Sequence, residues 1–155
     1  MIGLIVPRGL MVIMAALAVG AGAQDRSTLP LSDAYHACVD HAAGATLPSI
    51  ACNETEQGAW DTRLNTAFEA LVRRDAAADT SDPLGGPATT FRAGQRRTDT
   101  LGSAQRAWIT YREAECQYEA TEFNGSGSRV VESTCLLRIT VQRALALQER
   151  LTNTR

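Results

Sequence analysis

The apolar residues of this chain repeat at helical spacing, and no segment shows the alternation that is typical of strands. The pattern predicts four helices, at about residues 32–43, 53–78, 95–123 and 129–152. Ser32 is the predicted N-cap of the first helix, and Asn53 with Glu56 three residues later resembles a capping box at the start of the second. The predicted fold class is therefore all-α, a small antiparallel four-helix domain.

Two connections between these helices carry strong turn signals. Residues 80–94 contain Ser-Asp-Pro and Gly-Gly-Pro, which predict a long surface connection between the second and third helices. Residues 124–128 read Asn-Gly-Ser-Gly-Ser and predict a turn between the last two helices. The last two helices should therefore form an antiparallel hairpin.

The third helix has polar residues on its apolar face. At 3.6 residues per turn, one face collects Leu101, Ala104, Gln105, Trp108, Ile109, Arg112 and Cys116. A buried amide or guanidinium is costly unless it is hydrogen-bonded. Gln105 and Arg112 should therefore meet a second helix that carries acceptors.

The second helix offers such acceptors. Asp61 and Asn65 lie one turn apart beside its apolar positions. We expect Arg112 to donate to Asp61 and Gln105 to meet Asn65. The predicted structural polar network comprises Asp61, Asn65, Gln105, Arg112 and Glu115, and the predicted core aromatic residues are Trp60, Phe68 and Trp108. We interpret these residues as structural, because buried polar groups usually serve one another.

The four cysteines predict two disulfides that staple the helical domain. Three pairings are possible. Cys116 and Cys135 lie almost symmetrically about the turn at residues 124–128, and such positions face each other in a helical hairpin. This pairing is favoured, and Cys38 with Cys52 then follows by elimination.

The N-terminal 23 residues have the layout of a secretory signal peptide. Arg8 precedes an apolar run over residues 9–19, and Ala21-Gly22-Ala23 provides small residues for cleavage. The run is short for a membrane span, and no cysteine follows it to carry a lipid anchor. Residues 24–155 then form a single domain, which we expect in the periplasm or outside the cell without a membrane anchor.

Charge and composition narrow the possible partners only slightly. All 15 basic residues are arginine, and we infer no nucleic-acid site from them. Loss of Arg8 leaves 14 basic against 17 acidic residues, a net charge of about −3 for residues 24–155. This mild acidity favours approach to a basic partner.

Enzymatic and metal chemistry find no convergent motif in the sequence. His36 and His41 are five residues apart, which places them on different sides of a helix, so we expect no metal site and no cofactor. Carboxylates are plentiful, as on any helical surface, but no nucleophile elbow is present and the cysteines are expected to be oxidised. We therefore assign no catalytic residue.

Two motifs resemble a known family. Trp60-Asp61-x-x-Leu64-Asn65-x-x-Phe68-x-x-Leu71 and Ala104-Gln105-Arg106-Ala107-Trp108-Ile109-x-Tyr111-Arg112-x-Ala114-Glu115-Cys116 are similar to the LprI-like family of bacterial envelope proteins. Cys135 and Thr140-x-x-Arg143-Ala144-x-x-Leu147 extend the resemblance, which covers roughly residues 31–151. The family is named for lysozyme inhibition. The resemblance implies a protein-interaction module whose partner is a lysozyme.

An inhibitor of that kind should present a rigid loop to the cleft of the enzyme. Residues 123–129 qualify because the expected disulfide holds them, and residues 80–94 qualify through Arg92. The candidate contacts are Asn124, Ser126, Arg129 and Arg92. The alternatives are an envelope protein with another partner, which an exposed apolar patch would favour, and a cell-wall enzyme, which a raised carboxyl pKa would favour.

Overall fold

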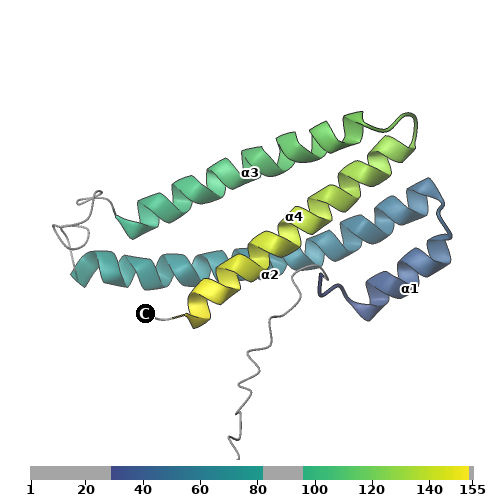
Figure 1. The fold of residues 1–155 in the computed structure, drawn as a ribbon. Helices are drawn as coiled ribbons and strands as arrows, with labels where there is room; N and C mark the ends of the chain where they lie inside the picture. Colours follow the sequence, from purple (N-terminus) through teal and green to yellow (C-terminus); the bar gives the residue numbers. More distant parts are fainter. Residues whose placement is uncertain (1–28, 82–95, 154–155) are drawn as a thin grey trace, which may run out of the picture.

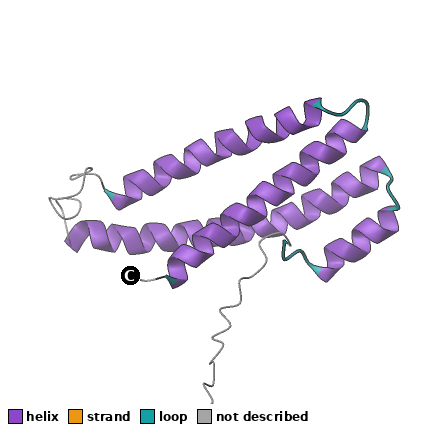
Figure 2. Ribbon diagram, viewed as in Figure 1, coloured by secondary structure: helices purple, strands orange, loops and turns teal. Residues whose placement is uncertain are grey.

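The computed structural model describes residues 29–81 and 96–153 of the 155-residue chain. Within these ranges it contains four helices and no strand: α1 (Asp33–Ala42), α2 (Thr46–Ser81), α3 (Arg97–Thr121) and α4 (Gly127–Thr152) (Figure 1). Figure 2 shows short loops joining α1 to α2 and α3 to α4. The predicted all-α class is confirmed.

Consecutive helices run antiparallel, so that α2 and α4 run in the same direction (Figure 1). α4 packs against both α2 and α3, whereas α1 packs against the N-terminal part of α2. Hydrogen bonds join α2 and α4 near both ends of their contact. The Asn53 amide donates to Ser133 at 2.9 Å, and Arg74 donates to the backbone carbonyl of Arg150 at 2.7 Å.

α2 begins seven residues earlier than the sequence pattern predicts. Its first turn contains Pro48, whose missing N–H is tolerated there because the first-turn donors have no intrahelical acceptor. Asn53 and Glu56 lie inside the helix and are buried, so the predicted capping box is wrong. The N-cap prediction for α1 is right: the Ser32 hydroxyl accepts from the Tyr35 N–H at 3.0 Å.

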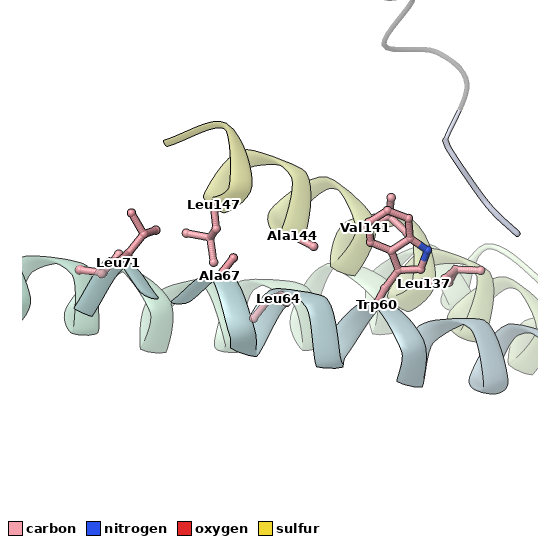
Figure 3. Packing of buried hydrophobic residues seen from close by; sticks show 9 residues of the cluster. Trp60, Leu64, Ala67, Leu71, Leu137, Val141, Ala144 and Leu147 are labelled. Carbon is pink, nitrogen blue, oxygen red and sulfur yellow. The ribbon is translucent and has the colours of Figure 1, made fainter. Parts of the chain in front are cut away.

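The main core lies between α2 and α4 and reaches α3. Its buried members are Trp60, Leu64, Ala67, Leu71, Leu101, Leu137, Val141, Ala144 and Leu147. Figure 3 shows Leu147 facing Ala67 across the two helices and Val141 beside Trp60. Small alanines alternate with larger side chains along this contact, which lets the two helices approach closely.

α3 contributes a narrower buried seam than its sequence predicts. Leu101, Gln105 and Cys116 are buried, whereas Ala104 is exposed and Ile109 is 39% exposed. The reason is that α3 lies at the edge of the bundle, where a single line of residues meets the other helices. The prediction that Ala104 and Ile109 share the buried face is wrong.

The start of α3 is tied to the end of α2. Asp79 of α2 accepts from the backbone N–H groups of Arg97 and Thr98 at 2.8 and 3.1 Å, and from the Thr98 hydroxyl at 2.7 Å. These are the free donors of a helix N-terminus, which favours a carboxylate. The bonds, led by the one from Arg97, lower the pKa of Asp79. Asp79 thus caps α3 from another helix.

Candidate functional site

The hairpin of α3 and α4 is held by a disulfide close to its turn. Cys116 and Cys135 are bonded, with Cα atoms 5.4 Å apart, and Ile139 packs against the buried cystine. Arg138 and Glu119 form an ion pair across the same two helices. The second disulfide joins Cys38 of α1 to Cys52 of α2. These are the two pairs that the sequence predicts.

The turn beyond this cystine is exposed and tightly wound. Gly125 has φ of 69°, a left-handed conformation that glycine adopts without strain, and its carbonyl accepts from the Ser128 hydroxyl at 2.8 Å. Asn124, Ser126 and Arg129 are all exposed. We call residues 123–129 the hairpin turn. The fourth candidate contact, Arg92, lies outside the described residues.

The hairpin turn lies near the start of α2. The Thr46 hydroxyl approaches the Ser126 hydroxyl at 3.4 Å. Arg129 has no hydrogen-bond or ion-pair partner among the described residues, so its guanidinium is available to a partner molecule. Phe123, at the end of α3, is 51% exposed. The hairpin turn therefore combines hydrogen-bonding groups with one large apolar side chain.

Farther from the turn, polar side chains of three helices meet in what we call the polar layer. Its members are Asp61 of α2, Gln105, Trp108 and Arg112 of α3, and Thr140 and Arg143 of α4. Arg112 Nη1 donates to Asp61 at 3.4 Å and to Thr140 at 3.1 Å. Arg143 donates to Gln105 Oε1 through both Nε and Nη2, each at 3.0 Å. The layer thus links α3 to both neighbouring helices.

The structure brings together only part of the predicted polar network. Arg112 lies against Asp61 as expected, but Asn65 is exposed and Gln105 bonds Arg143 instead. The physical reason is that α3 packs mainly on α4, which places an α4 side chain opposite Gln105. Glu115 is partly exposed and has no polar partner among the described residues. The inclusion of Asn65 and Glu115 is therefore wrong.

The three predicted core aromatic residues differ in burial. Trp60 is 2% exposed and belongs to the main core. Phe68 is partly buried against that core, and Trp108 is partly buried between it and the Cys116–Cys135 cystine. Trp108 therefore bridges the two apolar clusters, beside the polar layer.

A buried hydrogen-bond cluster at the start of α1 is absent from the sequence prediction. Glu56 of α2 accepts from the Ser32 backbone N–H at 3.0 Å, from the Ser32 hydroxyl at 2.6 Å and from Trp60 Nε1 at 3.0 Å. The Tyr35 hydroxyl donates to Asn53, whose amide donates to Ser133 and Thr134 of α4. This cluster fixes α1 to both long helices. The spacing of Glu56 and Trp60, one helical turn apart, is the signal that could have indicated it.

The electrostatics of this cluster favour an ionised Glu56. Burial alone would raise the pKa of Glu56, but the hydrogen bonds from Ser32 and Trp60, with the nearby charge of Arg63, lower it below 4.5. Burial and the negative charge of Glu56 raise the pKa of Tyr35. Both shifts keep Glu56 as the acceptor and Tyr35 as a donor at neutral pH.

We expect replacement of Glu56 by glutamine to lower the free energy of unfolding at pH 7 by about 1–3 kcal/mol, because a charged acceptor of buried donors is lost. Since the folded pKa is depressed, the contribution of Glu56 is complete above pH 4.5 and is lost as pH falls through the folded pKa. Urea unfolding at pH 7 and pH 3 measures both effects. Glu54→Gln, at an exposed neighbouring position, is the control. A Glu56→Gln effect that is the same at both pH values contradicts the assignment.

Two further features bear on the class of protein. Among the described residues, no group of histidine, cysteine and acidic side chains has the arrangement of a metal site. His36 and His41 are exposed on α1, and the His36 ring contacts the ring of Tyr35 edge-on, with centroids 5.7 Å apart. None of the helices within the described ranges has the length and apolar character to span a membrane.

Fold and cystines together define a small all-α domain stapled by two disulfides, built around a helical hairpin. The chain belongs to the LprI family. The model of that family, described as lysozyme inhibitor LprI, matches residues 38–147. The match contains both cystines, the polar layer and the hairpin turn. It confirms the resemblance seen in the sequence motifs.

Comparison with individual proteins adds less. An uncharacterized protein of Rhizobium meliloti (strain 1021) is 31% identical over 99 residues, which cover 63% of this chain and 68% of that protein. No solved structure matches the chain significantly. The family description names a class of inhibitors and not an enzyme.

Proposed function

We propose that this protein is exported and inhibits a lysozyme, and that the hairpin turn makes the central contacts. The match to a family described as lysozyme inhibitors carries the proposal. It concerns the class of partner only. The position of the binding surface is argued from the geometry of the hairpin turn.

The hairpin turn suits an enzyme cleft that contains carboxylates. Lysozymes cleave their substrate with a pair of acidic residues in a groove. Arg129, Asn124 and Ser126 offer exposed hydrogen-bonding groups, and the adjacent Cys116–Cys135 cystine restrains the two helices that carry them. A restrained loop loses less conformational entropy on binding, which favours affinity. The turn would then block sugar access while its donors meet the acidic residues.

Export is the second part of the proposal. Residues 1–23 read as a signal peptide, although they lie outside the described residues. Two cystines support an oxidising compartment, since disulfides form and persist there and are rare in the bacterial cytosol. A periplasmic or secreted protein is therefore expected, where it would meet a lysozyme that reaches the cell wall.

We expect the oxidised protein from Gln24 onward to suppress lysis of peptidoglycan by an animal-type or goose-type lysozyme in a stoichiometric titration. Replacement of Arg129 by alanine should weaken inhibition by about tenfold or more, as for a central charged contact. Arg106→Ala is the matched control, because Arg106 is also exposed but lies in the N-terminal half of α3, away from the hairpin turn. The readout is the loss of turbidity of a cell-wall suspension.

Two outcomes of this assay would separate the parts of the proposal. Inhibition that is unchanged by Arg129→Ala and by joint replacement of Asn124 and Ser126 would place the binding surface elsewhere. Failure of the unaltered protein to inhibit either lysozyme would remove the functional proposal itself.

A second candidate is an envelope protein that binds a different protein partner through α3. Its support is the set of apolar and aromatic side chains that α3 and the turn leave open: Ile109 is 39% exposed, Tyr111 53%, Phe123 51% and Tyr118 65%. Tyr111 and Tyr118 are seven residues apart and share one face of α3. Exposed tyrosines of this kind are typical of protein interfaces. Crosslinking in the periplasm would identify such a partner.

The pKa shifts of the carboxyl groups give no support to a third candidate, a cell-wall enzyme. A catalytic acid needs a raised pKa. The pKa values of Glu56 and Asp79 are both lowered, by hydrogen bonds that serve α1 and α3 respectively.

A further inference from the structure

The polar layer contains more positive than negative charge. Two guanidinium groups, Arg112 and Arg143, meet one carboxylate, Asp61. Asp61 lies 3.4 Å from Arg112 Nη1, and its side chain is 40% exposed, so solvent weakens the attraction. Among the described carboxylates, none lies within ion-pair distance of Arg143. One positive charge of the layer therefore has no counter-charge there.

Both guanidinium groups are held close to the same indole. The Cζ atoms of Arg112 and Arg143 lie 4.9 and 5.8 Å from the centroid of the Trp108 ring. The side chain of Arg112 is only 16% exposed. Burial, and secondarily the charge of Arg150, lower the pKa of Arg143. Two like charges in a partly desolvated place repel each other, and an anion between them would relieve this repulsion.

Several donors of the two arginines are unused. Arg112 Nε is buried and has no hydrogen-bond partner, which is rare for a buried polar atom. Arg143 directs both Nε and Nη2 at the single oxygen of Gln105, so its Nη1 bonds nothing among the described residues. Arg112 Nη2 is likewise unbonded within the described part of the chain. The layer thus combines excess positive charge with unsatisfied donors.

We propose that the polar layer is a binding site for a small carboxylate, held between Arg112 and Arg143 against the indole of Trp108. A single carboxylate balances the one uncompensated charge, and its two oxygens match the parallel N–H groups of a guanidinium. The Trp108 ring offers an apolar wall for the carbon attached to the carboxylate. The partly exposed Asp61 marks the open side of the layer. This site is independent of the hairpin turn and of the proposed inhibition.

Acetate is the probe for this site, titrated into the oxidised protein while chloride keeps the ionic strength constant. The chain has two tryptophans, so its spectrum contains two indole N–H resonances, and a Trp108→Phe variant assigns them. We expect acetate to shift the Trp108 resonance saturably in the millimolar range, whereas Trp60, whose Nε1 bonds Glu56, stays unchanged. Bound acetate should also raise the thermal unfolding midpoint, since it binds the folded chain.

Variants of Arg143 test the assignment. Arg143→Gln should weaken acetate binding by about tenfold or more, because a charged bidentate donor is lost. Arg143→Lys keeps the charge without the planar fork, so it should also bind more weakly, and it serves if the glutamine variant does not fold. Arg106→Gln should bind acetate as the unaltered protein does. The proposal is overturned if acetate has no effect beyond that of chloride, or if both Arg143 variants bind it unchanged.

Discussion

Replacement of Trp60 by alanine is expected to lower the free energy of unfolding by about 3–5 kcal/mol, the range for removal of a large buried aromatic side chain. Trp60 is 2% exposed, packs in the main core between α2 and α4, and donates to Glu56 through Nε1 at 3.0 Å. Its loss leaves a cavity and removes one donor from a buried carboxylate. Denaturant unfolding followed by circular dichroism measures the change.

The size of this effect depends on the position of the tryptophan, which Trp108 tests. Trp108 is only partly buried, so Trp108→Ala should cost less than Trp60→Ala. Because natural domains are marginally stable, Trp60→Ala could unfold the protein altogether. Trp60→Phe, which keeps most of the buried volume but removes the donor, should then show a smaller loss of stability. Equal losses for Trp60→Ala and Trp108→Ala would contradict the core described above.

The elements set by periodicity and turn chemistry could be predicted from the sequence. Trp60, Leu64 and Leu71 repeat at the spacing of one helical face, and all are buried in α2. The glycines and serines of residues 124–128 indicated the hairpin turn, and this in turn indicated the Cys116–Cys135 pair. Each inference used residues close in sequence, whose geometry a helix or a turn determines.

The start of α2 could not be predicted from local rules. Asn53 followed by Glu56 has the pattern of a capping box, but both side chains bond other helices. A polar residue inside a helix has the same sequence signature as a cap when the tertiary partner is unknown. Only the packing of α1 and α4 onto α2 decides between the two roles.

The polar layer shows the same limit for the candidate sites. The stripe on α3 correctly indicated that Gln105 and Arg112 need partners, but it could not identify the helix that supplies them. Arg143 of α4 lies 38 residues from Gln105 in the sequence, and no spacing rule connects them. The charge excess that supports the carboxylate site therefore becomes visible only when three helices are placed together.

Removal of the Cys116–Cys135 cystine by joint replacement with alanine is expected to lower the free energy of unfolding by about 3 kcal/mol in the chain-entropy model, for cysteines 19 residues apart. Alanine suits this site because both cysteines are at most 1% exposed, and a serine hydroxyl would be buried without a partner. The cystine restrains the two helices that carry the hairpin turn. We therefore expect inhibition of lysozyme to weaken as well, by about tenfold or more, as the turn loses its restraint.

The second cystine is the matched control for this prediction. Cys38 and Cys52 are 14 residues apart, so their joint replacement by alanine should cost a similar free energy. That cystine ties α1 to α2 and does not restrain the α3–α4 hairpin. Inhibition measured well below the unfolding temperature of each variant should then survive loss of Cys38–Cys52 and weaken on loss of Cys116–Cys135. An equal loss of inhibition in both variants would mean that stability alone, and not the restraint of the hairpin turn, determines binding.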